Sequence, residues 1–89
     1  SKFEYKAWKD GTISTINNRA ISKIARVAGA PDDKGAGIYL NKHVGSEVKK
    51  GDVLYTVYAH NKIELNFAKK ALESLKSVSI RWKHLNTID

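Results

Sequence analysis

Two segments of the chain repeat apolar residues at helical spacing, which limits the folds open to it more than any other feature. The first helix is expected to begin after Asn17 or Asn18 as its N-cap and to run to about Ala28, where Gly29 can end it. Its buried stripe would consist of Ile21, Ile24, Ala25 and Ala28. The opposite face carries Arg19, Lys23 and Arg26, and we expect it to be exposed to solvent.

The second helical segment opens with a capping box, because Asn61 is followed three residues later by Glu64. We expect this helix to end near Lys76. Its apolar stripe comprises Leu65, Ala68, Ala71, Leu72 and Leu75. Two helices with one apolar face each need a further layer to pack on.

Alternating apolar and polar residues predict the strands of that layer. Residues 3–8 and 12–16 flank Asp10-Gly11, a dipeptide typical of a type I′ turn, so we expect them to form a hairpin. In that register Trp8 would face Ile13, and Tyr5 would face Ile16. Further strands are expected at residues 37–41, 53–59 and 78–82, with a tight turn over residues 44–52.

The order strand, strand, helix, strand, strand, helix, strand predicts a mostly antiparallel α+β domain. Its 89 residues suit one domain and leave no room for a second. In the strand at residues 53–59, alternation places Val53, Tyr55, Val57 and Ala59 on one face, and Leu54, Thr56 and Tyr58 on the other.

Composition excludes several classes of protein. The chain has no cysteine, hence no disulfide framework and no thiolate metal site, which suits a cytoplasmic location. No apolar run approaches the roughly 20 residues of a membrane span. The net charge of +7 invites a nucleic-acid partner, but Lys and Arg are spread along the whole chain. We therefore expect a solvated basic surface and neither a membrane nor a nucleic acid as partner.

The residues that could carry catalysis do not cluster. His43, His60 and His84 are far apart in the sequence, and none has a second histidine at helical spacing. Asp32-Asp33 lies in a polar loop and is expected to shape a turn. The glycine-rich segment 29–37 lacks the Walker pattern and leads into a strand, so it does not predict a phosphate site. We expect no catalytic residue, no metal and no cofactor.

A carrier domain is an alternative interpretation of residues 44–59. They resemble the G-x-x-V-x-x-G-D-x-L half of biotinyl and lipoyl carrier domains, whose modified lysine follows shortly afterwards on a hairpin tip. Lys62 lies about where such a lysine would be sought. It falls, however, in the first turn of the second predicted helix, and carrier domains have no counterpart of the helix at residues 18–28.

A family resemblance covers residues 3 to 75. The segments Lys9-Asp10-Gly11-Thr12-Ile13 and Ala28-Gly29-Ala30-Pro31-Asp32-Asp33-Lys34-Gly35-Ala36-Gly37-Ile38 resemble the C-terminal domain of the thymidine/pyrimidine nucleoside phosphorylase family. Gly45, Val48 and Gly51-Asp52-Val53-Leu54 continue the match. The pattern A-G-A-P-x-D-K-G-A-G-I is similar to that of the archaeal AMP phosphorylase branch.

This resemblance implies that residues 1–89 form a C-terminal module of a longer enzyme, folded as an α/β-hammerhead related to barrel-sandwich hybrids. Such enzymes are cytoplasmic pentosyltransferases that cleave a nucleoside or AMP with inorganic phosphate. From AMP they give adenine and ribose 1,5-bisphosphate. The phosphate loop and the base-contacting motif of the family precede this domain, so no catalytic residue carries over and the module alone is expected to be inactive. The chain begins at Ser1 and has no Met, which initiator removal or excision from a longer protein would explain, and the resemblance favours excision.

The implied partners are the central and N-terminal domains of the same enzyme, within a homo-oligomer. We expect the loop that follows the first helix to dock on them, because it has nine residues and three glycines. The docking residues would be Gly29, Ala30, Pro31, Lys34, Gly35, Gly37 and Tyr39, with Tyr55 or Tyr58 as further exposed aromatics. A free-standing basic module that binds RNA is the remaining alternative, and it predicts binding that weakens steeply with salt.

Overall fold

Six strands and two helices make up residues 1–30 and 35–82, the part of the chain that the computed structural model describes. In chain order they are β1 (Lys2–Lys6), β2 (Gly11–Ile16), α1 (Asn18–Ala28), β3 (Gly37–Leu40), β4 (Glu47–Val48), β5 (Val53–Tyr58), α2 (Lys62–Ser74) and β6 (Val78–Arg81). The strands form two antiparallel sheets, β1-β5-β3 (sheet A) and β4-β2-β6 (sheet B). The predicted α+β class is confirmed.

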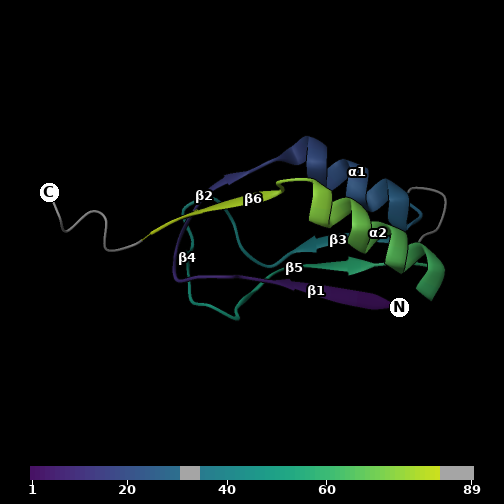
Figure 1. Ribbon diagram of the computed structural model, residues 1–89, viewed down its shortest axis with the longest axis horizontal. Coiled ribbons are helices and arrows are strands. Elements are labelled where there is room, and N and C mark those ends of the chain that lie inside the picture. The colour runs from purple at the N-terminus through teal and green to yellow at the C-terminus, as the bar shows by residue number, and fades with distance from the viewer. Residues whose placement is uncertain (31–34, 83–89) are drawn as a thin grey trace, which may run out of the picture.

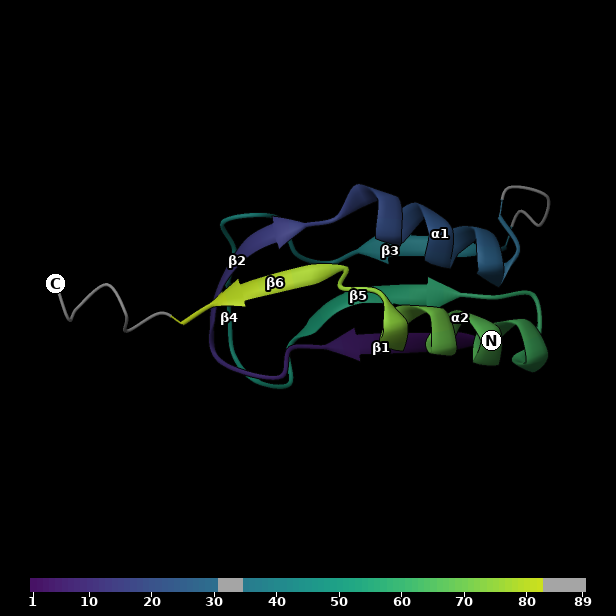
Figure 2. The same cartoon turned by 45° about the horizontal axis from the view of Figure 1, so that its top comes forward.

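Both helices lie on the same face of sheet A (Figures 1 and 2). α1 packs on β3 and β5, α2 packs on β1 and β5, and the two helices pack on each other. Their predicted apolar stripes supply the buried residues Ile24, Ala28, Leu65, Ala68 and Leu72. The core therefore lies between the helix layer and sheet A, and it continues into sheet B through Ile13, Val48, Val78 and Ile80.

The helix ends follow the caps that the sequence predicts. Asn17 Oδ1 accepts hydrogen bonds from the backbone N–H groups of Arg19 and Ala20 at 3.0 and 3.1 Å, so Asn17 is the N-cap of α1. Gly29 ends α1 with φ +125°, a conformation that favours glycine. At α2, Asn61 Oδ1 accepts from the Glu64 N–H at 2.8 Å, which confirms half of the capping box. The helix ends at Ser74, two residues before the predicted end.

The predicted hairpin between the first two strands is wrong. β1 pairs with β5, with Tyr5 opposite Tyr55, whereas β2 pairs with β4 and β6, with Ile13 opposite Ile80. A type I′ turn needs positive φ at both central residues, and neither Asp10 nor Gly11 has it. The chain instead crosses here from sheet A to sheet B.

Contacts with a distant turn hold this crossing in place. The Ala7 N–H donates to the Asp52 carbonyl at 2.8 Å, and the Gly51 N–H donates to the Ala7 carbonyl at 2.9 Å. The Lys50 N–H donates to Asp10 Oδ1 at 2.7 Å. Asp10 therefore makes a contact with a distant turn. The pairing of distant parts of the chain overrides the local preference of Asp10-Gly11 for a hairpin turn.

Residues 44–52 hold more structure than the predicted tight turn. Glu47 and Val48 form β4 opposite Thr12 and Gly11 of β2. Periodicity cannot reveal a strand of two residues, because alternation needs a longer window. As a result, sheet B has a third strand that the sequence does not predict.

Candidate functional site

The described residues of the predicted docking loop lie at the end of the molecule where α1 finishes and β3 begins (Figure 1). Gly29 and Ala30 also have a structural role there, because their N–H groups donate to the carbonyls of Arg26 and Ala25, both at 3.1 Å, and close α1. Gly35 is exposed, and Gly37 opens β3 with φ +149°. Two further docking residues of the sequence prediction, Pro31 and Lys34, lie outside the described residues.

One face of sheet A carries no helix of the described residues, and we refer to it as the open face. Phe3 and Tyr5 of β1 turn toward the core. Side chains alternate along a strand, so their neighbours turn away from the core. The register then defines the open face as Lys2, Glu4, Lys6, Gly37, Tyr39, Thr56 and Tyr58. The helix layer thus encloses only one side of sheet A.

Two tyrosines dominate the apolar area of this open face. Tyr39 on β3 is 62% exposed, and Tyr58 on β5 is 41% exposed. Tyr58 stands opposite Gly37, which has no side chain, so nothing from β3 covers its ring at that position. Between the tyrosines Thr56 is buried, and its Oγ1 donates to Asn41 Oδ1 at 3.3 Å. Tyr39, Tyr58 and a glycine of the docking loop therefore lie together on the open face.

Tyr55, the other aromatic expected at the docking surface, is fully buried, so that prediction is wrong. β5 is the central strand of sheet A, and Tyr55 faces the helix layer. Its ring packs on that of Tyr5 with 4.9 Å between centroids, and its hydroxyl hydrogen-bonds Ser77 Oγ at 2.9 Å. Burial raises the pKa of the Tyr55 phenol to about 12 and also raises the pKa of Tyr5.

This pKa shift predicts alkaline sensitivity. Tyrosine ionises near pH 10 in the unfolded chain but near pH 12 at position 55 of the folded chain. The neutral Tyr55 phenol therefore stabilises the fold fully below pH 10, and this stabilisation is lost as the pH rises toward 12. We expect Tyr55 to account for a loss of about 2 kcal/mol in the free energy of unfolding across that range. Urea unfolding at pH 8, 10 and 11 measures how steeply the free energy of unfolding falls with pH. Tyr55→Phe should make the free energy of unfolding depend less on pH. It should also cost about 1 kcal/mol at neutral pH, because the hydrogen bond to Ser77 is lost. An unchanged pH dependence in this variant would contradict the assignment to Tyr55.

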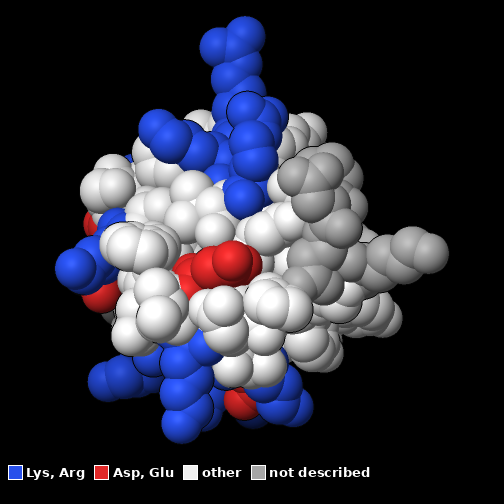
Figure 3. Space-filling model, turned by 90° about the vertical axis from the view of Figure 1, so that its right-hand side faces the viewer, with Lys and Arg blue, Asp and Glu red and all other residues white. Residues whose placement is uncertain are grey.

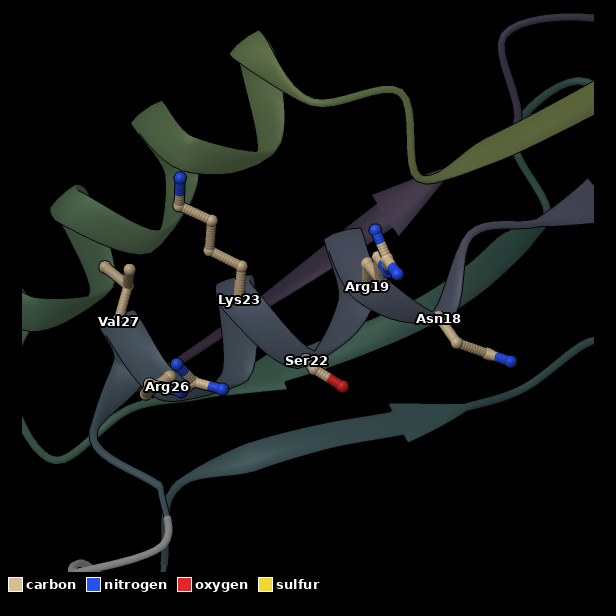
Figure 4. Close-up of a pocket in the computed structure, with 6 residues that line it drawn as sticks. All are labelled: Asn18, Arg19, Ser22, Lys23, Arg26 and Val27. Carbon is tan, nitrogen blue, oxygen red and sulfur yellow. The ribbon is translucent and has the colours of Figure 1, made fainter.

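Basic residues gather on the outer side of α1. Arg19, Lys23 and Arg26 are exposed, and they border a shallow groove along the helix together with Asn18, Ser22 and Val27 (Figure 4). Seen from the docking-loop end, Lys and Arg side chains lie at the upper and lower margins, with acidic side chains between them (Figure 3). This end of the molecule therefore presents charges of both signs.

The described residues show no catalytic arrangement. His43 and His60 lie at the surface, and His84 lies outside the described range. Within residues 1–30 and 35–82 no group of three His, Asp or Glu residues could hold a metal ion. The Asp52 carboxylate accepts a backbone N–H from Lys49 at 2.9 Å, which shapes the turn before β5. No helix among these residues is long and apolar enough to cross a membrane.

The carrier interpretation conflicts with the position of Lys62. This lysine is the first residue of α2, whereas a carrier lysine occupies a hairpin tip between two strands. The strand before it, β5, pairs with β1 and β3 and not with a strand that follows Lys62. The half-motif at residues 44–59 thus occurs without the hairpin that carries the modification.

Several exposed apolar residues were not singled out by the sequence. Ile63 and Phe67 of α2 are 67% and 56% exposed. Both lie outside the predicted apolar stripe of this helix, so the sequence pattern already indicated that they are exposed. Trp8 and Trp82 are partly exposed at the sheet B end, where Lys9 Nζ lies 4.5 Å from the centroid of the Trp82 ring. Trp8 lies in the crossing between the sheets, which the local pattern does not predict.

Comparison with known proteins places the chain among enzyme C-terminal domains. Residues 12–79 match the model of the pyrimidine nucleoside phosphorylase C-terminal domain. The chain is 47% identical over 79 residues to the AMP phosphorylase of Methanocaldococcus jannaschii, covering 89% of this chain and 16% of that protein. It is 48% identical over 66 residues to the AMP phosphorylase of Thermococcus kodakarensis, covering 74% of this chain and 13% of that protein. It is 51% identical over 59 residues to AMP phosphorylase 1 of Archaeoglobus fulgidus, covering 66% of this chain and 12% of that protein. The chain thus spans less than one fifth of the length of these relatives.

Proposed function

The chain belongs to the family of pyrimidine nucleoside phosphorylase C-terminal domains, and from this premise we propose that it is the C-terminal module of an AMP phosphorylase. The observation that carries the proposal is the 47% identity to a protein of that name over 79 residues, most of this chain. All three relatives described above come from archaea. The parent enzyme would work in the cytoplasm as a homo-oligomer.

The parent reaction would be phosphorolysis of AMP. An oxygen of inorganic phosphate forms a bond to C1′ of the ribose while the bond from C1′ to N9 of adenine breaks. The products are ribose 1,5-bisphosphate and adenine, which takes up a proton. The groups that perform these steps would belong to the preceding domains, and this module would contribute none of them.

The role left to the module is docking, and the open face of sheet A is the surface that we assign to it. Tyrosine is enriched at protein interfaces, because it buries a large rigid ring and keeps a hydroxyl for hydrogen bonding. Tyr39 and Tyr58 present such rings and hydroxyls on a face that no described element covers. Gly35 and Gly37 beside them let a partner approach the backbone closely. This end of β3 lies at the same end of the molecule as the end of α1, so we include Gly29 and Ala30 in the docking surface (Figure 1).

A domain exchange tests this function. The C-terminal segment of the Methanocaldococcus jannaschii AMP phosphorylase is replaced by this chain, and adenine released from AMP and phosphate is measured by liquid chromatography. We expect the chimera to release adenine at a rate within about tenfold of the parent, because the exchange leaves the reacting groups in place. The isolated 89-residue chain should release none. An inactive chimera that is folded, or activity in the isolated chain, would contradict the proposal.

The same chimera separates the docking face from the rest of the surface. Tyr39→Ser with Tyr58→Ser should weaken docking by about 2 kcal/mol or more, seen as easier proteolysis at the domain junction and a lower inactivation temperature. Ile63→Ser with Phe67→Ser removes comparable exposed apolar area from α2 and should leave both readouts unchanged. The reverse result would assign docking to α2 and not to the open face.

A further inference from the structure

The groove on the outer side of α1 has the form that receives a second helix. Two rows of side chains border it, Asn18–Ser22–Arg26 and Arg19–Lys23–Val27 (Figure 4). Members of each row are four residues apart, so the rows are neighbouring ridges of one helix and the hollow is the groove between them. In helix packing, such a groove accepts a ridge of side chains from the partner helix.

The charge of this groove has a single sign. α1 contains three cations and no acidic residue, including none in its first turn. Arg19 and Lys23 are four residues apart, Lys23 and Arg26 three apart, and like charges at these spacings repel on a helix surface. Arg19 also lies in the first turn, where the helix dipole favours anions. Within residues 1–30 and 35–82 none of the three takes part in an ion pair.

The sequence of α1 thus places three mutually repelling cations around one groove, of which only Arg26, in the last turn, is favoured by the helix dipole. A ridge of carboxylates would relieve this repulsion, because it would set an anion beside each cation. Asn18 and Ser22 add an amide and a hydroxyl that can bond the same oxygens. No aromatic residue borders the groove among the described residues, so it lacks the stacking surface on which proteins bind unpaired bases.

The position of the groove leaves it accessible while sheet A is docked. α1 covers the inner face of sheet A, so its outer side and the open face lie on opposite sides of the domain (Figures 1 and 2). A partner on α1 would therefore not compete with a partner on Tyr39 and Tyr58. This second surface does not depend on the function proposed above.

We propose that the α1 groove binds an acidic helix of another protein. The ridge that enters the groove carries Asp or Glu at intervals of three and four residues, facing Arg19, Lys23 and Arg26. Val27 gives the groove an apolar end, against which a small side chain of the partner packs. Recognition is electrostatic in its rate and specificity, so it weakens as salt is added.

A designed peptide tests this binding. The probe is an alanine-based helix of about 20 residues with Glu along one ridge, and its control has Gln at the same positions. Fluorescence anisotropy with the 89-residue chain at low ionic strength should show binding of the Glu peptide, with an affinity on the order of tenfold above that of the Gln peptide.

Charge reversal locates the site. Arg19→Glu with Arg26→Glu should weaken binding of the Glu peptide by on the order of tenfold or more. Lys2→Glu with Lys6→Glu makes the same change in net charge on the open face and should weaken binding less than about threefold. Arg19→Glu alone adds an acid to the first turn and an attractive pair with Lys23, so α1 should keep its circular dichroism signal. Should either variant unfold, Arg19→Gln with Arg26→Gln replaces it, with the same expected direction.

Three outcomes would overturn the proposal. An equal loss of affinity for Lys2→Glu with Lys6→Glu and for Arg19→Glu with Arg26→Glu would show attraction by net charge alone. Equal binding of the Glu and Gln peptides would exclude an acidic ridge as the ligand. Tighter binding of a single-stranded RNA of about 12 nucleotides than of the Glu peptide, weakened by the α1 variants, would assign the groove to nucleic acid.

Discussion

Gly11→Ala should lower the free energy of unfolding by about 3 kcal/mol, because the change forces an atom into occupied space. A β-carbon at this position would overlap the carbonyl group of Arg81 and lie 2.7 Å from Ile80 Cγ2. The Arg81 carbonyl belongs to the backbone of β6, so it can move only if the pairing of β2 with β6 is disturbed. Urea unfolding followed by tryptophan fluorescence measures the loss.

A second glycine provides the comparison. Gly45 has φ +93°, and no atom lies within 4 Å of the place that a β-carbon would take there, so Gly45→Ala meets backbone strain but no obstruction. We expect a cost of about 1 kcal/mol at this position. Equal losses at Gly11 and Gly45 would show that the close approach of β6 to β2 does not decide the effect.

Ile24→Ala is expected to cost about 3 kcal/mol or more through the loss of buried contacts. Ile24 is fully buried in α1, between the helices and sheet A. Its removal leaves a cavity at the centre of the core, where neighbours from several elements cannot all move inward. Because a domain of this size has a total stability of about 5–13 kcal/mol, the variant should melt well below the parent chain.

Ile63→Ala makes the identical chemical change on the surface of α2. Ile63 is 67% exposed, so little apolar area returns to water and the cost should stay within about 0.5 kcal/mol. Thermal unfolding followed by circular dichroism compares the two variants. Similar melting temperatures would mean that the helix layer does not pack on sheet A as described.

The parts of the fold that the sequence predicts well are those with local causes. Both helices begin at asparagine caps, and α1 ends at Gly29, because capping bonds join residues a few positions apart. The final strand follows alternation within a few residues. In each of these segments the physical cause and its effect lie in the same short window of sequence. β5 forms where alternation predicts a strand, but Leu54 is buried in the same core as Tyr55 because the register with β1 shifts at this point.

The candidate site was predictable only in part. Tyr39 and Tyr58 are exposed on the open face, as expected of docking residues. Tyr55 follows the same alternation but is buried, because alternation separates two faces without saying which one the helices cover. The pairing of Phe3 and Ile38 with Val57 decides that choice, and these contacts join strands far apart in the chain.

The sequence by itself determined the α+β class, both helices with their caps, and most of the strands. Only the tertiary structure decided that β1 and β2 enter different sheets, although Asp10-Gly11 favours a hairpin between them. The energy of a two-residue turn is small, whereas the pairing of β1 with β5 packs the partly buried Phe3 and Tyr5 against the core beneath the helix layer. The open face and the α1 groove follow from that same choice, because it sets which sides of sheet A and of α1 remain in solvent.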